Sequence, residues 1–195
     1  MTNLNAKPFF LTVMAAFAFL LLGSFMIPNG KAIPRVPFSA DSLAYFFSAS
    51  PYYIIIDKSD YELKVYDKLG WYATYPVVFG SKDLSDKMRE GDKRTPTGEF
   101  TIVIKKIHKK WNEELLLNYP TDESFKRFQE RKAKGLIPAT AKIGDGIAIH
   151  ATRPGEEWTV DNFYNWTDGC ISVKYSEMKD LYSYIPTGTK VTIKN

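Results

Sequence analysis

The segment Trp166-Thr167-Asp168-Gly169-Cys170-Ile171-Ser172 contains the only cysteine among the 195 residues of this chain. Gly169 comes immediately before the cysteine. A glycine at this position permits a backbone angle that other residues avoid, and it lets a second segment approach closely. Backbone N–H groups at such a turn can also point at the oxyanion that develops on a substrate carbonyl. The segment is therefore typical of a turn that presents a nucleophile, with a buried, inert thiol as the alternative.

A cysteine nucleophile needs a base, because a free thiol with a pKa of about 8.5 is mostly protonated at neutral pH. The chain has two histidines. His150 ends the strand-like segment 146–150, in which two isoleucines point to one face while Ala148 and His150 point to the other. His150 therefore lies at a strand end beside small residues and is the better candidate base. His108 lies in the basic segment 105–110 and is predicted to be a surface residue.

Composition excludes several other classes of protein. One cysteine and one histidine twenty residues apart fall short of the ligands of a structural zinc site, so we predict no metal and no other cofactor. The net charge is only +4 and the basic residues form no long run, so nucleic acid is not an expected partner. A hydrophobic content of 45% is ample for a core, and the length suits one domain with an appendage.

The pattern from residue 52 onward predicts a mainly β domain with helical insertions. A helix is predicted over 122–134, with acidic residues in its first turn, lysines in its last and Gly135 beyond. A second helix is predicted over 176–185, with one apolar side. We expect about seven short strands in all. The segments with strand character are 52–56, 62–66, 71–79, 100–105, 146–150 and 189–194.

The N-terminal 51 residues are of a different kind. Residues 9–27 contain no charge and are just numerous enough to cross a bilayer, and Lys7 precedes them. No small-residue cleavage motif follows, which favours an uncleaved signal anchor over residues 1–27, with a cleaved signal peptide as the alternative. Four prolines mark residues 28–51 as a linker. Either interpretation directs the domain at 52–195 out of the cytoplasm.

Several segments in order resemble the L,D-transpeptidase catalytic domain (YkuD-like) family. His150 followed by Thr167-Asp168-Gly169-Cys170 resembles its histidine and Ser/Thr-x-Gly-Cys signature. Residues 91–100, Gly-Asp-Lys-Arg-Thr-Pro-Thr-Gly-Glu-Phe, resemble its Gly-Asp-x-x-Thr-Pro-x-Gly-x-Phe segment. The opening strands at 53–66 and the closing strand at 191–193 also fit, so the resemblance covers about 52–195. Leu117-Asn118-Tyr119-Pro120 and the Trp-Thr-Asp-Gly-Cys form of the signature resemble a branch found in Gram-negative bacteria.

This resemblance implies a β-sandwich or barrel-like domain in the periplasm, anchored to the inner membrane by residues 9–27, that acts on peptidoglycan stem peptides. It implies that Cys170 is the nucleophile and His150 its base, with the carbonyl of Ala151 orienting the ring. The N–H groups of Gly169 and Cys170 are the implied oxyanion donors. The expected reaction forms a thioester at Cys170 with loss of D-alanine, after which an amine takes the acyl group to give a 3-3 crosslink or a protein–peptidoglycan link.

The chain departs from the family pattern at two positions. Asp168 stands where histidine is usual, and Ser172 stands where many relatives have arginine or asparagine. We expect Thr167, Asp168 and Ser172 to bind substrate, and Arg153 or the pair at 93–94 to compensate at the position of Ser172. Two alternatives stay open. In the first, the same acyl-enzyme is hydrolysed by water, as in an L,D-carboxypeptidase or an amidase that releases a wall-linked protein. In the second, the chain is a non-catalytic peptidoglycan-binding module.

Overall fold

The computed structural model describes residues 50–195. The predicted signal anchor, and the linker up to residue 49, lie outside the described residues. Within residues 50–195, no helix combines the length and the apolar character needed to cross a membrane.

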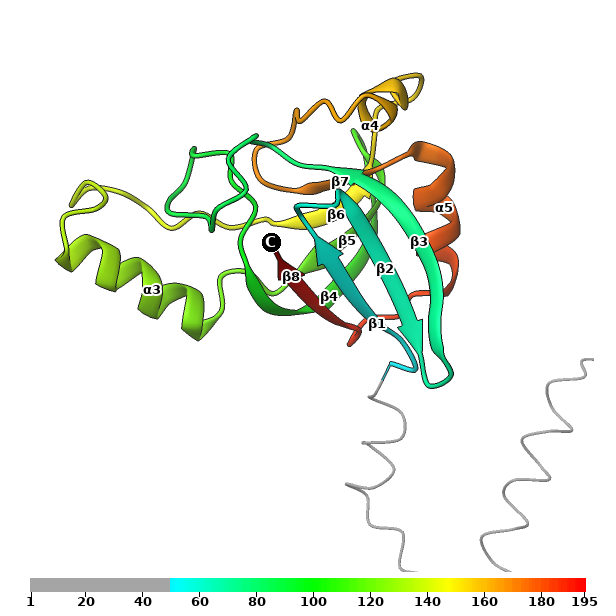
Figure 1. Cartoon of the computed structure of the whole chain (residues 1–195), viewed down its shortest axis with the longest axis horizontal. Helices are drawn as coiled ribbons and strands as arrows, with labels where there is room; N and C mark the ends of the chain where they lie inside the picture. The colour runs from blue at the N-terminus through cyan, green and yellow to red at the C-terminus, as the bar shows by residue number, and fades with distance from the viewer. Residues whose placement is uncertain (1–49) are drawn as a thin grey trace, which may run out of the picture. The chain divides into compact units, whose positions relative to one another are not determined.

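Eight strands close into a barrel, in the spatial order β1-β2-β3-β7-β6-β5-β4-β8 (Figure 1). Most neighbours are antiparallel, but β1 pairs with β8, and β6 with β7, in parallel. The predicted mainly β, barrel-like domain is therefore confirmed. The strands are β1 (Tyr53–Asp57), β2 (Glu62–Asp67), β3 (Gly70–Val78), β4 (Gly98–His108), β5 (Asn112–Leu117), β6 (Ala148–Ala151), β7 (Ile171–Val173) and β8 (Lys190–Lys194).

On β1 and β2, every second residue is apolar and faces the inside of the barrel. Ile54 and Ile56 on β1, and Leu63 and Val65 on β2, are completely buried, while the residues between them are not. Burying one such side chain stabilises the fold by about 1.5–3 kcal/mol. Inward-facing residues of the other strands complete a single core, which includes Val77, Phe100, Ile102, Leu115, Ile149, Ile171, Val191 and Ile193.

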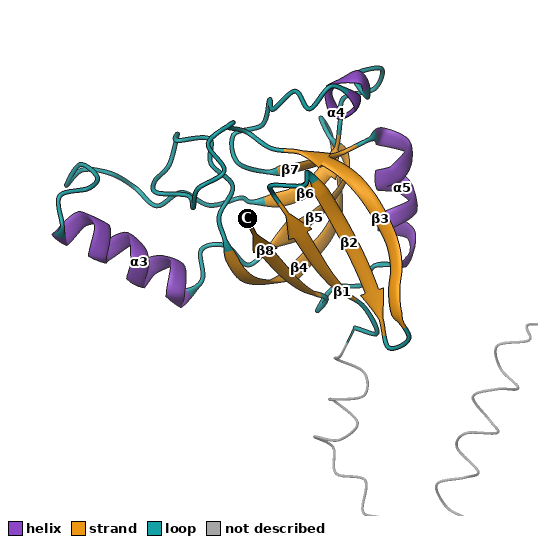
Figure 2. Ribbon diagram, viewed as in Figure 1, coloured by secondary structure: helices purple, strands orange, loops and turns teal. Residues whose placement is uncertain are grey.

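Within residues 50–195, three helices lie outside the barrel (Figure 2). Helix α3 (Asp122–Ala133) begins where the Thr121 hydroxyl accepts a hydrogen bond from the Ser124 N–H, and its two ends carry the charges that suit the helix dipole. Helix α5 (Tyr175–Tyr184) buries Met178 and Leu181 and packs against β5 and β6. Both helices were predicted within about one residue. The single-turn helix α4 (Trp158–Asp161) was not predicted.

The sequence pattern also missed β5 and β7, which flank β6 in the sheet. Strand β5 contains the adjacent residues Glu113 and Glu114, which interrupt any apolar alternation, yet both are buried. Strand β7 has only three residues, too few to show a period. Their pairing with β6 places the residue after Cys170 beside the strand that carries His150.

Candidate active site

The turn before β7 holds the Cys170 backbone in place. Gly169 has a φ of 124°, and a Cβ atom there would lie 2.8 Å from the Arg94 carbonyl oxygen, so only glycine fits. The Thr167 hydroxyl accepts a hydrogen bond from the Gly169 N–H (3.2 Å) and donates one to the Cys170 carbonyl (2.7 Å). Gly169 thus adopts the unusual backbone angle, and meets the close approach of a second segment, that the sequence indicated.

His150 lies on β6 between two neighbouring strands of the sheet. Its partner on β5 is Glu114, and its partner on β7 is Ser172. Its side chain is almost fully buried, and its Nδ1 lies 2.8 Å from the carbonyl oxygen of Ala151. In the neutral ring Nδ1 donates to this carbonyl, which leaves Nε2 as the atom that can accept a proton.

Two tryptophans enclose the His150 ring. Trp111 stacks on it with centroids 5.0 Å apart and planes at 24°, and Trp166 meets it edge-on at 5.6 Å. The guanidinium of Arg153 lies over both indoles, 5.6 Å and 5.3 Å from their centroids. These contacts exclude water from the ring and restrict its rotation, in addition to the hydrogen bond to Ala151.

Cys170 and His150 line the same cavity, which has a volume of about 520 Å³. The Cys170 thiol donates a hydrogen bond to the carbonyl of Gly146 at 3.4 Å, and the described residues show no hydrogen bond between the thiol and the imidazole. The rest of the cavity wall carries both signs of charge. It consists of Lys106, His108, Trp111, Glu114, Leu116, Leu117, Tyr119, Asp145, Gly146 and Ala148.

Burial sets the protonation state of the two groups. It raises the pKa of the Cys170 thiol to about 11, and it lowers the pKa of His150 below its ordinary value. The hydrogen bond to Ala151 acts on His150 in the opposite direction but is the smaller effect. The resting site therefore holds a neutral thiol and a neutral imidazole at pH 7, and a thiolate forms only when a proton is transferred.

The family model of the L,D-transpeptidase catalytic domain (YkuD) matches residues 51–193. The chain belongs to this family. A sequence comparison with curated proteins gave no match.

Two solved structures of longer proteins share the fold of this chain. The helical cell shape determining protein Pgp2 from Campylobacter jejuni shares 22% identity at a TM-score of 0.55, over 75% of this chain and 48% of that one. Bd1075 from Bdellovibrio bacteriovorus shares 24% identity at a TM-score of 0.53, over 76% of this chain and 49% of that one. The chain thus spans about half the length of either.

In this L,D-transpeptidase domain, the four residues expected at the chemical centre lie together. Cys170 and His150 share the cavity, Ala151 holds the ring and Gly169 forms the turn. One detail differs from expectation. The Gly169 N–H already donates to Thr167, so among the described residues the Cys170 N–H is the one of the two that has no partner.

None of the four residues expected to bind substrate lines the cavity that contains Cys170. Ser172 is completely buried and Thr167 nearly so, and neither lines the cavity, which excludes direct contact with substrate in this geometry. Asp168 is exposed beside the turn. Arg153 lines a separate groove of about 300 Å³ with Trp158, Tyr164 and Trp166.

Sequence reasoning missed most of the cavity wall. Trp111, Glu114 and His108 belong to the β4–β5 hairpin, and Asp145 precedes β6. His108, predicted to be a surface residue, lines the cavity and stacks on Trp111 at 6.3 Å. No local signal marks these residues, because only the pairing of β5 with β6 brings the hairpin to the site.

Proposed function

We propose that this chain catalyses acyl transfer on peptidoglycan stem peptides through a thioester on Cys170, with L,D-transpeptidation as the net reaction. One observation carries the proposal beyond family membership. Cys170 and His150 open into one cavity, and the bond from His150 Nδ1 to Ala151 leaves Nε2 as the proton acceptor. A nucleophile, a base and a group that orients the base are the parts that covalent acyl transfer needs.

The first half-reaction forms the thioester. Cys170 Sγ attacks the carbonyl carbon of the amide between a diamino acid and the terminal D-alanine, while its proton moves to His150 Nε2. The Cys170 N–H donates to the developing oxyanion. The carbon–nitrogen bond then breaks, and His150 returns the proton to the amine of the departing D-alanine.

The second half-reaction releases the acyl group. An acceptor amine attacks the thioester carbonyl and loses a proton to His150, and the Cys170 thiolate leaves and is reprotonated. The cavity suits peptides that carry both amines and carboxylates, because its wall offers Lys106 as well as Glu114 and Asp145. Its volume of about 520 Å³ is in the range of small-molecule and peptide sites.

We further propose that the domain works in the periplasm, held at the inner membrane by residues 9–27. The support is the uncharged run of that segment after Lys7. Protease treatment of spheroplasts checks this proposal. A periplasmic domain is digested in intact spheroplasts, whereas protection would contradict it.

The reaction is tested by incubating the full chain in detergent with purified tetrapeptide muropeptides and analysing the mixture by mass spectrometry. Crosslinked dimers with loss of D-alanine support transpeptidation. Shortened monomers without dimers identify water as the acceptor and overturn the transpeptidase assignment while keeping the acyl-enzyme. An unchanged mixture, equal to that with Cys170→Ala, supports the non-catalytic alternative.

A further inference from the structure

A buried lysine lies directly against the residue that precedes Cys170. Lys87, in the loop between β3 and β4, is only 4% exposed, and its Nζ pairs with Asp92 Oδ1 at 2.9 Å. The position that a Cβ atom would take on Gly169 is 3.5 Å from this Nζ. The ammonium group is therefore in contact range of the nucleophile's turn, although it does not line the cavity with Cys170.

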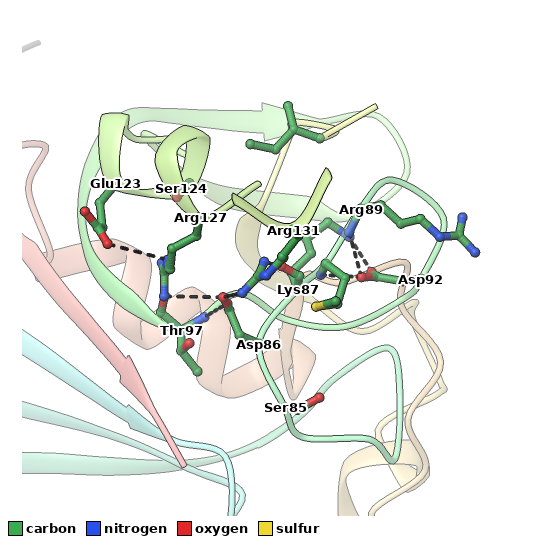
Figure 3. Close-up of polar contacts among 12 residues, drawn as sticks. Ser85, Asp86, Lys87, Arg89, Asp92, Thr97, Glu123, Ser124, Arg127 and Arg131 are labelled. Atoms are coloured by element: carbon green, nitrogen blue, oxygen red, sulfur yellow. Dashed lines mark hydrogen bonds and ion pairs between the residues drawn. The ribbon is translucent and has the colours of Figure 1, made fainter. Parts of the chain in front are cut away.

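The loop holds Lys87 in this place through Asp92 (Figure 3). Besides its ion pair, the Asp92 carboxylate accepts hydrogen bonds from the backbone N–H groups of Met88 (2.6 Å), Arg89 (3.0 Å) and Arg94 (3.0 Å). The carbonyl of Arg94 in turn lies against Gly169. One carboxylate thus fixes both the ammonium group and the backbone that touches the turn.

Helix α3 fixes the other side of the same loop. Arg131 donates to the Lys87 carbonyl at 2.6 Å and pairs with Asp86, and Arg127 donates to the Thr97 carbonyl at 2.8 Å (Figure 3). Asp86 also accepts from the Thr97 N–H at 2.8 Å. Because contacts from two sides restrain the loop, Lys87 cannot withdraw from Gly169 without breaking several of them.

The charges around Cys170 give the lysine an electrostatic consequence. Glu114 and Asp168 are the acidic groups that act on the thiol, and both oppose its ionisation. Burial, the largest effect, raises the pKa of Cys170, whereas the Lys87 ammonium acts in the opposite direction. The other charged or titratable groups of the cavity are Lys106, which pairs with Glu114 at 3.1 Å, His108, Tyr119, Asp145 and His150.

We propose that Lys87 is a positioning residue for Cys170. Its ammonium, held against Gly169 by Asp92 and helix α3, fixes the nucleophile's turn and stabilises the negative charge that Cys170 acquires when His150 takes its proton. This proposal rests on the proposed role of Cys170 and extends it, because it assigns a function to a loop that contributes no residue to the cavity wall beside the thiol.

The test measures how fast iodoacetamide alkylates Cys170 in the full chain at a fixed pH near 8, by intact-protein mass spectrometry. Lys87→Met/Asp92→Asn removes the cation together with its counter-charge. Losing a nearby cation raises a thiol pKa by about one unit, which lowers the thiolate fraction about tenfold. Higher intrinsic nucleophilicity restores part of this loss, so alkylation is expected to slow about three- to fourfold.

Asp92→Asn alone is the matched variant. It keeps the Lys87 ammonium, and Asp92 is not among the acidic groups that act on the thiol, so alkylation is expected to stay close to the wild-type rate. Lys64→Met, which removes a surface lysine that pairs with Glu62 on β2, is the control and leaves the rate unchanged. Circular dichroism at the assay temperature confirms that each variant is folded.

A merely structural role slows both Asp92-containing variants, and that result would overturn the proposal, as would an unchanged rate in the double variant. If the double variant does not fold, Lys87→Met alone is measured in its place, and an unchanged rate in that variant contradicts the proposal. Failure of the proposed function has a separate signature. The wild type would then leave muropeptides unchanged, or turnover would survive Cys170→Ala, while the alkylation rates would still report the charge of Lys87.

Discussion

The Nδ1 atom of His150 lies 2.8 Å from the carbonyl oxygen of Ala151, the next residue along β6. A backbone carbonyl therefore takes the orienting place that a carboxylate occupies in a serine protease triad. Because the carbonyl is neutral, it fixes the tautomer without adding a full negative charge beside the ring. His150 is thus well placed, and burial, the largest effect, lowers its pKa below the ordinary value although the hydrogen bond to Ala151 acts in the opposite direction.

Replacing either member of the pair removes turnover. Cys170→Ala deletes the nucleophile, and His150→Ala deletes the base, so each is expected to reduce muropeptide turnover by at least about three orders of magnitude. Product formation is followed by liquid chromatography and mass spectrometry, and thermal unfolding shows that the fold is retained. Wild-type turnover in Cys170→Ala would mean that another group is the nucleophile.

The pH dependence reports the state of His150. The base acts in its neutral form, so activity is lost when the pH falls through the pKa of the folded enzyme. Because burial lowers that pKa, the acid limb of kcat/KM is expected below the ordinary histidine value of about 6.5. A profile of initial rates from pH 4.5 to 8 locates the inflection, and an inflection above 7 contradicts the buried, neutral imidazole.

Trp111 is expected to control both the position and the pKa of His150. Trp111→Ala removes the ring that stacks on the imidazole at 5.0 Å, so water reaches the ring and its pKa rises. The acid limb should then move to higher pH, and kcat/KM at pH 7.5 should fall about tenfold as the base loses its orientation. Trp158→Ala is the matched control, because Trp158 is half-exposed on α4 and packs on Tyr164. Equal acid limbs in the wild type and Trp111→Ala would refute this role.

Gly80 is expected to be intolerant of any side chain. A Cβ atom there would lie 2.3 Å from the Lys93 carbonyl oxygen and 2.5 Å from that of Thr167, both of which are backbone atoms. Gly80→Ala should lower the free energy of unfolding by about 3 kcal/mol or more and displace the Cys170 turn. Gly155→Ala is the comparison. Its φ is +80° but no atom lies within 4 Å of the added Cβ, so the cost is only about 1–2 kcal/mol. Urea unfolding measures both, and similar losses would argue against the steric explanation.

Local pattern alone predicted the features that depend on local geometry. Alternation in β1 and β2 reveals which residues face the core, because side chains of a strand point to opposite faces in turn. The start and end of helix α3 follow from its terminal charges and from Gly135 beyond it. Gly169 and Cys170 are adjacent in the chain, so the sequence could also indicate a turn that presents a thiol.

The surroundings of the site were decided by tertiary structure. Trp111 stacks on His150, and Lys87 lies against Gly169, although these pairs are far apart in the chain. The buried Glu114 meets His150 only because β5 pairs with β6 in one register. The sequence by itself determined the chemical groups and the turn that carries the nucleophile. Barrel closure decided which side chains surround them, because strand register and the loops it brings together depend on contacts over the whole domain rather than on neighbours in the chain.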